Sequence, residues 1–140
     1  MTEAKILFLD FDGVLHATSG PATSMREFVW LPILKDLIGG HPDLRIVLHT
    51  SHRCTSSPEF LLARLGLGKD VCLGVTKPTL NRWPSIQDWT KGRPWIKSFR
   101  ILDDQAREFP NPPPTELILC DGRRGLSETR VQDALRQWLA

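Results

Sequence analysis

A short apolar run that ends in two aspartates constrains the fold of this chain more than any other feature. Residues 6–9 are followed directly by Asp10, Phe11, Asp12 and Gly13. Four uninterrupted apolar residues are too few for a helix and suit a strand that is covered on both faces. Because side chains two residues apart in an extended segment point the same way, Asp10 and Asp12 are expected to face one site at the end of that strand.

Apolar runs of similar length recur along the chain and alternate with segments of helical periodicity. Further strands are expected at residues 44–49, 71–75, 99–102 and 117–120. Apolar residues spaced by three and four predict helices at about 27–38, 59–65, 85–89 and 128–139. Pro32 favours a start of the first helix near Leu31. This alternation predicts a three-layer α/β/α, Rossmann-like fold with a mainly parallel sheet of five strands.

Length and composition fit an ordinary globular chain. The 140 residues suit one domain, spanning residues 1–140, and a formal charge of +2 argues against bulk electrostatic binding of nucleic acid. Cys54, Cys72 and Cys120 are odd in number and lack C-x-x-C spacing, which favours a reducing compartment, with Cys72 and Cys120 in the core. There is no signal-peptide pattern and no apolar run of about 18 residues. A cytoplasmic protein without a membrane segment is therefore expected.

Polar residues follow several of the expected strands. In open parallel sheets, ligands bind beyond the carboxyl ends of the strands. The residues expected to gather there are Asp10, Asp12, Thr50, Asp103 and Asp104. Neighbouring carboxylates repel each other unless a cation or a shared proton intervenes, and Mg²⁺ is a natural partner. One carboxylate of such a pair could attack phosphorus while the other handles protons, although a bare D-x-D-G could also be a surface turn.

Four motifs occur in order along the chain: the run of residues 10–14, Thr50-Ser51, Lys77-Pro78 and Asp103-Asp104. They resemble the motifs of the haloacid dehalogenase superfamily of phosphohydrolases, and the similarity spans about residues 5–121. The runs 50–53 and 101–104, with Asp121 and residues 125–127 after them, look closest to the phosphatase-like domains of RNA-repair proteins.

The resemblance implies a role for each motif residue. Asp10 would be the nucleophile that forms an aspartyl-phosphate, and Asp12 the general acid and base. Thr50 would bind a phosphoryl oxygen, with Ser51 as the alternative. Lys77 would neutralise phosphoryl charge, with Arg82 and Lys91 as alternatives. The residues implied to hold Mg²⁺ are Asp10, Asp12 through its backbone carbonyl, Asp103 and Asp104. Those expected to contact the substrate are Ser51, Arg53 and Arg82.

The segments after Gly13 and between Arg53 and Lys77 are too short for the full cap domain that members of the superfamily usually carry. The site is therefore expected to be open, unless a neighbouring subunit covers it. An open site suits a large phosphorylated substrate, such as a polymer end, including a nucleic-acid end, or a phosphoprotein, and a small phosphorylated molecule stays an alternative. The predicted function is a Mg²⁺-dependent phosphatase. The alternative is a nucleic-acid-end or protein-binding module that keeps the fold but has little activity.

Histidines and tryptophans near these motifs have two interpretations each. His16, His49 and His52 could orient a substrate, but a loop or packing role is favoured. Trp83, Trp89 and Trp95 lie near basic residues and could stack on bases, but a place in the core or on a helix face is favoured because aromatic side chains chiefly supply buried area.

Overall fold

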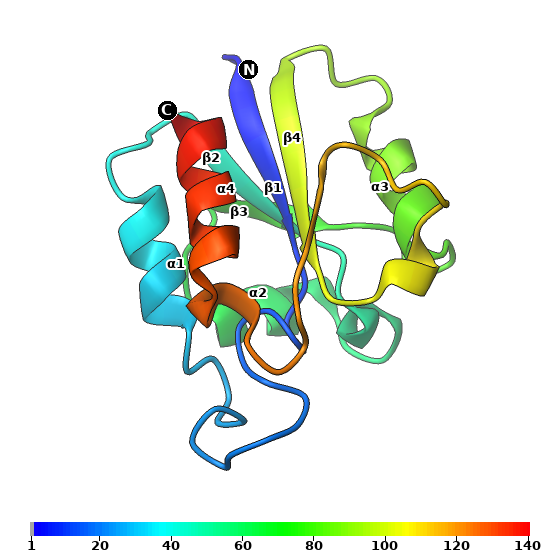
Figure 1. Ribbon diagram of the computed structural model, residues 1–140. Coiled ribbons are helices and arrows are strands. Elements are labelled where there is room, and N and C mark those ends of the chain that lie inside the picture. Colours follow the sequence, from blue (N-terminus) through cyan, green and yellow to red (C-terminus); the bar gives the residue numbers. More distant parts are fainter. Residues whose placement is uncertain (1) are drawn as a thin grey trace.

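The computed structural model describes residues 2–140 and has a five-stranded parallel sheet at its centre (Figure 1). The strands are β1 (Ala4–Leu9), β2 (Leu44–Leu48), β3 (Cys72–Val75), β4 (Ile96–Asp103) and β5 (Leu117–Leu119). Their order across the sheet is β3-β2-β1-β4-β5, and every neighbouring pair is parallel. The predicted α/β fold with a parallel sheet of five strands is confirmed.

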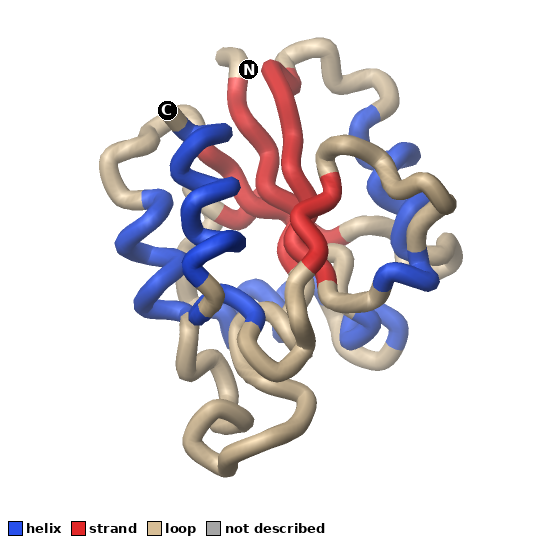
Figure 2. The backbone as a smooth tube through the Cα atoms, in the orientation of Figure 1, coloured by secondary structure: helices blue, strands red, loops and turns tan. Residues whose placement is uncertain are grey.

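Helices cover both faces of the sheet (Figure 2). They are α1 (Leu31–Ile38), α2 (Pro58–Leu65), α3 (Arg82–Thr90) and α4 (Thr129–Leu139), with short 3₁₀ helices η1 (Ser51–Cys54), η2 (Ala106–Glu108) and η3 (Gly125–Ser127). Helices α1, α2 and α4 share a core with Leu7 and Leu9 of β1, whereas α3 packs with Ile6 and Phe8. Alternate residues of β1 thus serve opposite layers. None of the helices in residues 2–140 is long and apolar enough to cross a membrane.

The starts of α1 and α3 can be compared with the sequence prediction, and the start of α3 places an arginine near the carboxyl edge of the sheet. Helix α1 begins at Leu31 with Pro32 in its first turn, and Phe28 ahead of it has a φ of 57°, which does not fit a helix. Helix α3 begins at Arg82, before the expected start at residue 85. The earlier start makes Arg82 the first residue of α3, at the end of the helix that faces the carboxyl edge of the sheet.

Aromatic residues beside α3 belong to the second core layer. The ring of Phe8 makes an edge contact with Trp89 at 6.0 Å between centroids, and Trp95 contacts Trp89 at the same distance. Trp83 packs near Phe109 at 6.2 Å. The three tryptophans are partly buried and pack against this layer, which agrees with the predicted place in the core or on a helix face.

The cysteines are free thiols, and Cys72 and Cys120 are buried as predicted, whereas Cys54 is exposed. Burial raises the pKa of the Cys72 thiol to about 12, which keeps it protonated at neutral pH. The two buried cysteines therefore act as small core residues.

Strand register brings the polar strand ends together. Leu9, the last residue of β1, pairs with Leu48 of β2 on one side and with Leu102 of β4 on the other. The residues that follow, Asp10 and Asp103 among them, therefore emerge at one level of the same edge. Because the three strands are central and apolar, the core determines this alignment.

Candidate active site

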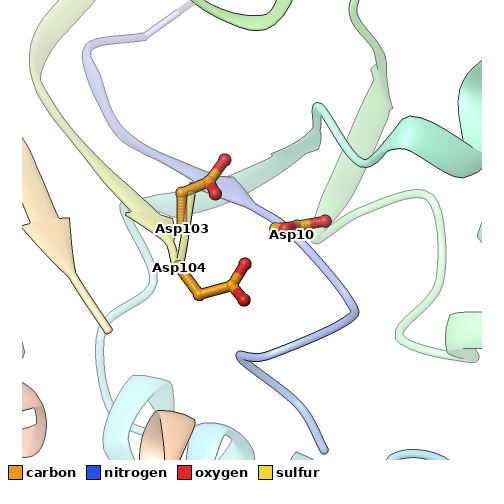
Figure 3. A group of neighbouring side chains, drawn as sticks. All are labelled: Asp10, Asp103 and Asp104. Atoms are coloured by element: carbon orange, nitrogen blue, oxygen red, sulfur yellow. The ribbon is translucent and has the colours of Figure 1, made fainter. Parts of the chain in front are cut away.

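Three aspartates at the carboxyl ends of β1 and β4 form the centre of the site (Figure 3). Asp10 is 1% exposed, Asp103 is fully buried and Asp104 is partly buried, and one carboxylate oxygen from each lies within 4.8 Å of those of the other two. Close carboxylates raise each other's pKa, and burial does the same. The pKa of Asp10 is raised by burial and by the charge of Asp103, while that of Asp104 is raised to about 6 by burial and by both neighbours.

Two glycines leave room for the Asp104 carboxylate. Gly13 has a φ of 78°, and a Cβ there would collide with the Asp104 side chain. A Cβ at Gly122 would lie 2.8 Å from Oδ2 of Asp104 and 2.9 Å from Oγ1 of Thr18. The turn after β1 and the turn after β5 therefore both close around Asp104.

Arg82 supplies the cation of the site. Its Nη1 donates to Oδ2 of Asp10 at 3.1 Å and to both oxygens of Asp103 at 2.8 and 2.9 Å. The side chain is 11% exposed, and the adjacent carboxylates raise the pKa of its guanidinium against the opposing effect of burial. Arg82 therefore stays charged between the nucleophile candidate and Asp103.

Lys77, predicted as the cation beside the phosphoryl site, pairs with an aspartate outside the cluster of three. Its Nζ pairs with Asp88 at 3.5 Å, and its side chain is 65% exposed. Lys91 follows the far end of α3, one helix length from Arg82. Of these three cations, only Arg82 contacts the aspartates within residues 2–140.

Asp103 and Asp104 differ in how their oxygens are used. Besides Arg82, Asp103 accepts from the backbone N–H of Gln105 at 2.8 Å and from Nε2 of His49 at 2.8 Å. Burial opposes its ionisation, but the hydrogen bond and charge of His49 and the charge of Arg82 lower its pKa overall. Among the described residues, the carboxylate of Asp104 receives a long contact of 3.4 Å from the side chain of Gln105 and a hydrogen bond from its own backbone N–H. Asp104 is thus the carboxylate with the freer oxygens.

Asp12 is held by two histidines. Nε2 of His16 lies 2.7 Å from its Oδ1, and Nε2 of His52 lies 2.9 Å from its Oδ2. Burial acts to raise the pKa of Asp12, but the two hydrogen bonds and the charges of the imidazoles lower it overall. The two imidazoles therefore favour the ionised form of Asp12, which is the form that accepts a proton.

The prediction of a loop or packing role for the histidines missed these contacts. His16, His49 and His52 each hydrogen-bond to a site aspartate. All three lie in the segments that directly follow β1 and β2, where the motif residues also lie. This position in the sequence could have indicated a contact with the site. Nδ1 of the buried His49 has no hydrogen-bond partner among the described residues.

The spacing and geometry of these residues agree with a comparison against protein families. The family described as the HAD domain in Swiss Army Knife RNA repair proteins matches residues 6–131. The chain belongs to this family. No curated protein and no solved structure gave a match. The predicted resemblance to haloacid dehalogenase phosphohydrolases, in the branch of RNA-repair proteins, is confirmed.

In this HAD domain, the residues after β2 have distinct positions. Thr50 is fully buried, and its Oγ1 accepts from the backbone N–H of His52 at 3.4 Å. Ser51 is exposed and lines the cavity described below. Both remain candidates for contact with a phosphoryl oxygen.

Arg53, predicted to contact the substrate, lines the cavity described below and is also bonded within the protein. Its guanidinium donates to the backbone carbonyls of His49 at 3.0 Å, Thr50 at 3.1 Å and Leu80 at 2.6 Å. These bonds join the end of β2 to the loop that precedes α3. Because most of its donors are used within the protein, the principal role of Arg53 is to hold this loop in place.

A cavity of about 450 Å³ opens beside the aspartates of the HAD domain. It is bordered by Asp12 and Arg82 at the site and by Ser51, Asn81 and Arg107 farther out. No cap domain covers it within residues 2–140, because the segments after β1 and β2 hold only loops, η1 and the helices of the layer. The site can therefore admit a phosphate group attached to a large molecule.

Proposed function

We propose that the protein is a Mg²⁺-dependent phosphomonoesterase that works through an aspartyl-phosphate on Asp10. The observation that carries the proposal is the contact of Arg82 with both Asp10 and Asp103, beside the less occupied Asp104. A buried carboxylate next to a fixed cation can stay ionised as a nucleophile while an anionic phosphate approaches. Membership of a phosphohydrolase-type family supports the same chemistry.

The reaction proceeds in two displacements. A carboxylate oxygen of Asp10 attacks phosphorus, and the bond from phosphorus to the ester oxygen breaks. Asp12, in the protonated form that each turnover regenerates, gives its proton to the departing alcohol. Asp12 then takes a proton from water as the water oxygen attacks phosphorus, which releases phosphate and restores Asp10. Arg82 stabilises negative charge on the phosphoryl oxygens, and Thr50 or Ser51 donates a hydrogen bond to one of them.

The acidic cluster fits Mg²⁺ because Asp104 carries a poorly compensated carboxylate whose pKa is raised to about 6. The groups that would hold the ion are the carboxylates of Asp10 and Asp104 and the backbone carbonyl of Asp12. Asp103 completes the set of nearby acids but is already hydrogen-bonded through both oxygens. When bound, Mg²⁺ neutralises charge on the phosphoryl group.

The substrate we propose is a phosphorylated polymer end, and an RNA end in particular. The open cavity accommodates a phosphate on a large molecule, and RNA repair appears in the description of the family. A panel of 5′- and 3′-phosphorylated RNA and DNA oligonucleotides, nucleotides and sugar phosphates ranks the classes by kcat/KM. Tight, salt-sensitive oligonucleotide binding without turnover would favour the binding-module alternative instead.

Asp10→Asn tests the proposal. It removes the nucleophile while keeping the size of the side chain, so Mg²⁺-dependent hydrolysis of p-nitrophenyl phosphate should fall by about 1,000-fold or more. Circular dichroism and thermal unfolding check the fold. Asp133→Asn is the matched control, because Asp133 is exposed on α4 and, within residues 2–140, forms an ion pair with Arg136 alone. Turnover by Asp10→Asn equal to that of the wild type would refute the proposal.

A further inference from the structure

The carboxylate of Asp12 is held from both sides by imidazoles that come from different parts of the chain. His16 lies in the turn after β1 and bonds to Oδ1, while His52 lies in η1 after β2 and bonds to Oδ2. The Asp12 side chain is 48% exposed, so burial alone leaves its orientation free. One hydrogen bond to each oxygen restricts both the position and the plane of the carboxylate.

Each imidazole is itself fixed by a second contact. Nδ1 of His16 accepts from the backbone N–H of Phe28 at 3.3 Å, so the proton of the neutral ring lies on Nε2 and points at Asp12. The ring of His52 lies against the buried Phe11, with 5.9 Å between ring centroids. Both imidazole rings are therefore held in place by a second contact while they hydrogen-bond to the Asp12 carboxylate.

We infer that His16 and His52 are positioning residues that orient Asp12 for the proton transfers of the reaction. The inference rests on the proposed phosphatase function. Each carboxylate oxygen has two lone pairs, so an oxygen that accepts from an imidazole keeps a second direction for a water or an ester oxygen. Asp12 also lines the cavity, where such a partner would lie. A carboxylate that is already fixed loses less conformational entropy when it reaches the reactive geometry.

The step most sensitive to this orientation is hydrolysis of the aspartyl-phosphate. There Asp12 removes one proton from water while the water oxygen bonds to phosphorus and the bond from phosphorus to Asp10 breaks. Formation of the intermediate from p-nitrophenyl phosphate needs little acid assistance, because nitrophenolate is a good leaving group. A misplaced Asp12 should therefore slow the second step more than the first.

A pair of amide substitutions at His52 tests the inference. His52→Gln can place an amide N–H close to the position of Nε2, whereas the shorter side chain of His52→Asn cannot reach Asp12. With p-nitrophenyl phosphate and Mg²⁺, His52→Asn should lower kcat by about 10- to 100-fold and change kcat/KM by less than about threefold. A burst of nitrophenol, close to one per protein molecule, should precede slow turnover. His52→Gln should keep most of the wild-type kcat and show no burst.

His16→Gln and His16→Asn repeat the test from the other oxygen, and His41→Asn is the control. His41 makes no side-chain hydrogen bond among the described residues, so its substitution should leave kcat unchanged. An equal fall of kcat and kcat/KM without rescue by Gln would mean a purely structural role and overturn the inference. Wild-type kcat in the Asn variants would also overturn it. If Asp10→Asn is inactive in the same assay, the proposed function survives either result; if it is fully active, the function itself fails.

Discussion

The four aspartates of the site fall into two groups: two accept a hydrogen bond from a histidine side chain, and two do not. Asp12 and Asp103 each accept from at least one imidazole, and their pKa values are lowered. Asp10 and Asp104 have no imidazole partner, and their pKa values are raised. Burial acts to raise the pKa of all four. The hydrogen-bond partner, rather than the depth of burial, therefore decides the direction of each pKa shift.

This difference assigns complementary tasks to the two kinds of aspartate. Imidazoles favour the ionised form of the first pair, in which Asp12 can accept a proton and Asp103, helped by the charge of Arg82, can anchor that arginine. The imidazole-free pair needs a cation, which Arg82 supplies to Asp10 and which a metal would supply to Asp104. This division is tested by substitutions that remove the cation or imidazole beside an aspartate, or that change Asp104 and its surroundings.

Removing the cation beside Asp10 should have the largest effect. Arg82→Leu leaves Asp10 and Asp103 without their shared donor, so phosphatase activity should fall by about 100-fold or more. Arg82→Lys keeps the charge but not the planar fork, and should restore only part of the activity. Lys77→Ala is the control and should stay within about twofold of the wild type in kcat/KM, because its ammonium pairs with Asp88. A larger loss in Lys77→Ala than in Arg82→Leu would reverse the assignment.

Removing the imidazole beside Asp103 should mainly cost stability. His49→Leu leaves a buried carboxylate without one of its donors, so the free energy of unfolding at pH 7 should fall by about 1–3 kcal/mol in urea titrations. His41→Leu removes a histidine without a side-chain hydrogen bond among residues 2–140, and should change the free energy of unfolding by less than about 0.5 kcal/mol. Equal stability of His49→Leu and the wild type would show that the hydrogen bonds from Arg82 and Gln105 are sufficient for the buried carboxylate of Asp103.

The raised pKa of Asp104 predicts how stability depends on pH in metal-free protein. Because the folded pKa, about 6, exceeds the ordinary value of 3.8, the folded state binds the proton more tightly, and the unfolding free energy should fall as pH rises from about 4 to 6. Allowing for the partial exposure of Asp104, the fall is about 1–2 kcal/mol. Asp104→Asn should remove this part of the pH dependence, measured by thermal unfolding at several pH values. Identical profiles would contradict the raised pKa.

Crowding the Asp104 carboxylate should have the smallest effect. In Gly122→Ala the new methyl group would lie 2.8 Å from Oδ2 of Asp104, so Asp104 must shift. The Mg²⁺ concentration for half-maximal activity should rise by about two- to fivefold, with less than about 1 kcal/mol lost in stability. Gly74→Ala, where nothing lies within 4 Å of the new Cβ, is the control. Unchanged Mg²⁺ dependence in Gly122→Ala would show that Asp104 is not a ligand.

Much of the fold followed from local patterns. Apolar runs between polar strand ends predicted all five strands, and Pro32 correctly marked the start of α1. The start of α3 was misplaced because the residues before it, Asn81 to Pro84, have little apolar periodicity. That shift matters for function, since it makes Arg82 the first residue of the helix and brings it against the aspartates.

By itself the sequence determined that Asp10, Asp12, Asp103 and Asp104 gather at one edge of the sheet. Apolar strands in a parallel sheet align through their cores, so residues just beyond them converge without further information. Only the tertiary structure decided which cation and which histidines serve them. Those side chains come from loops and helix ends, where a change of a few residues in where a helix begins, or in the path of a turn, decides whether a group bonds to an aspartate or faces solvent.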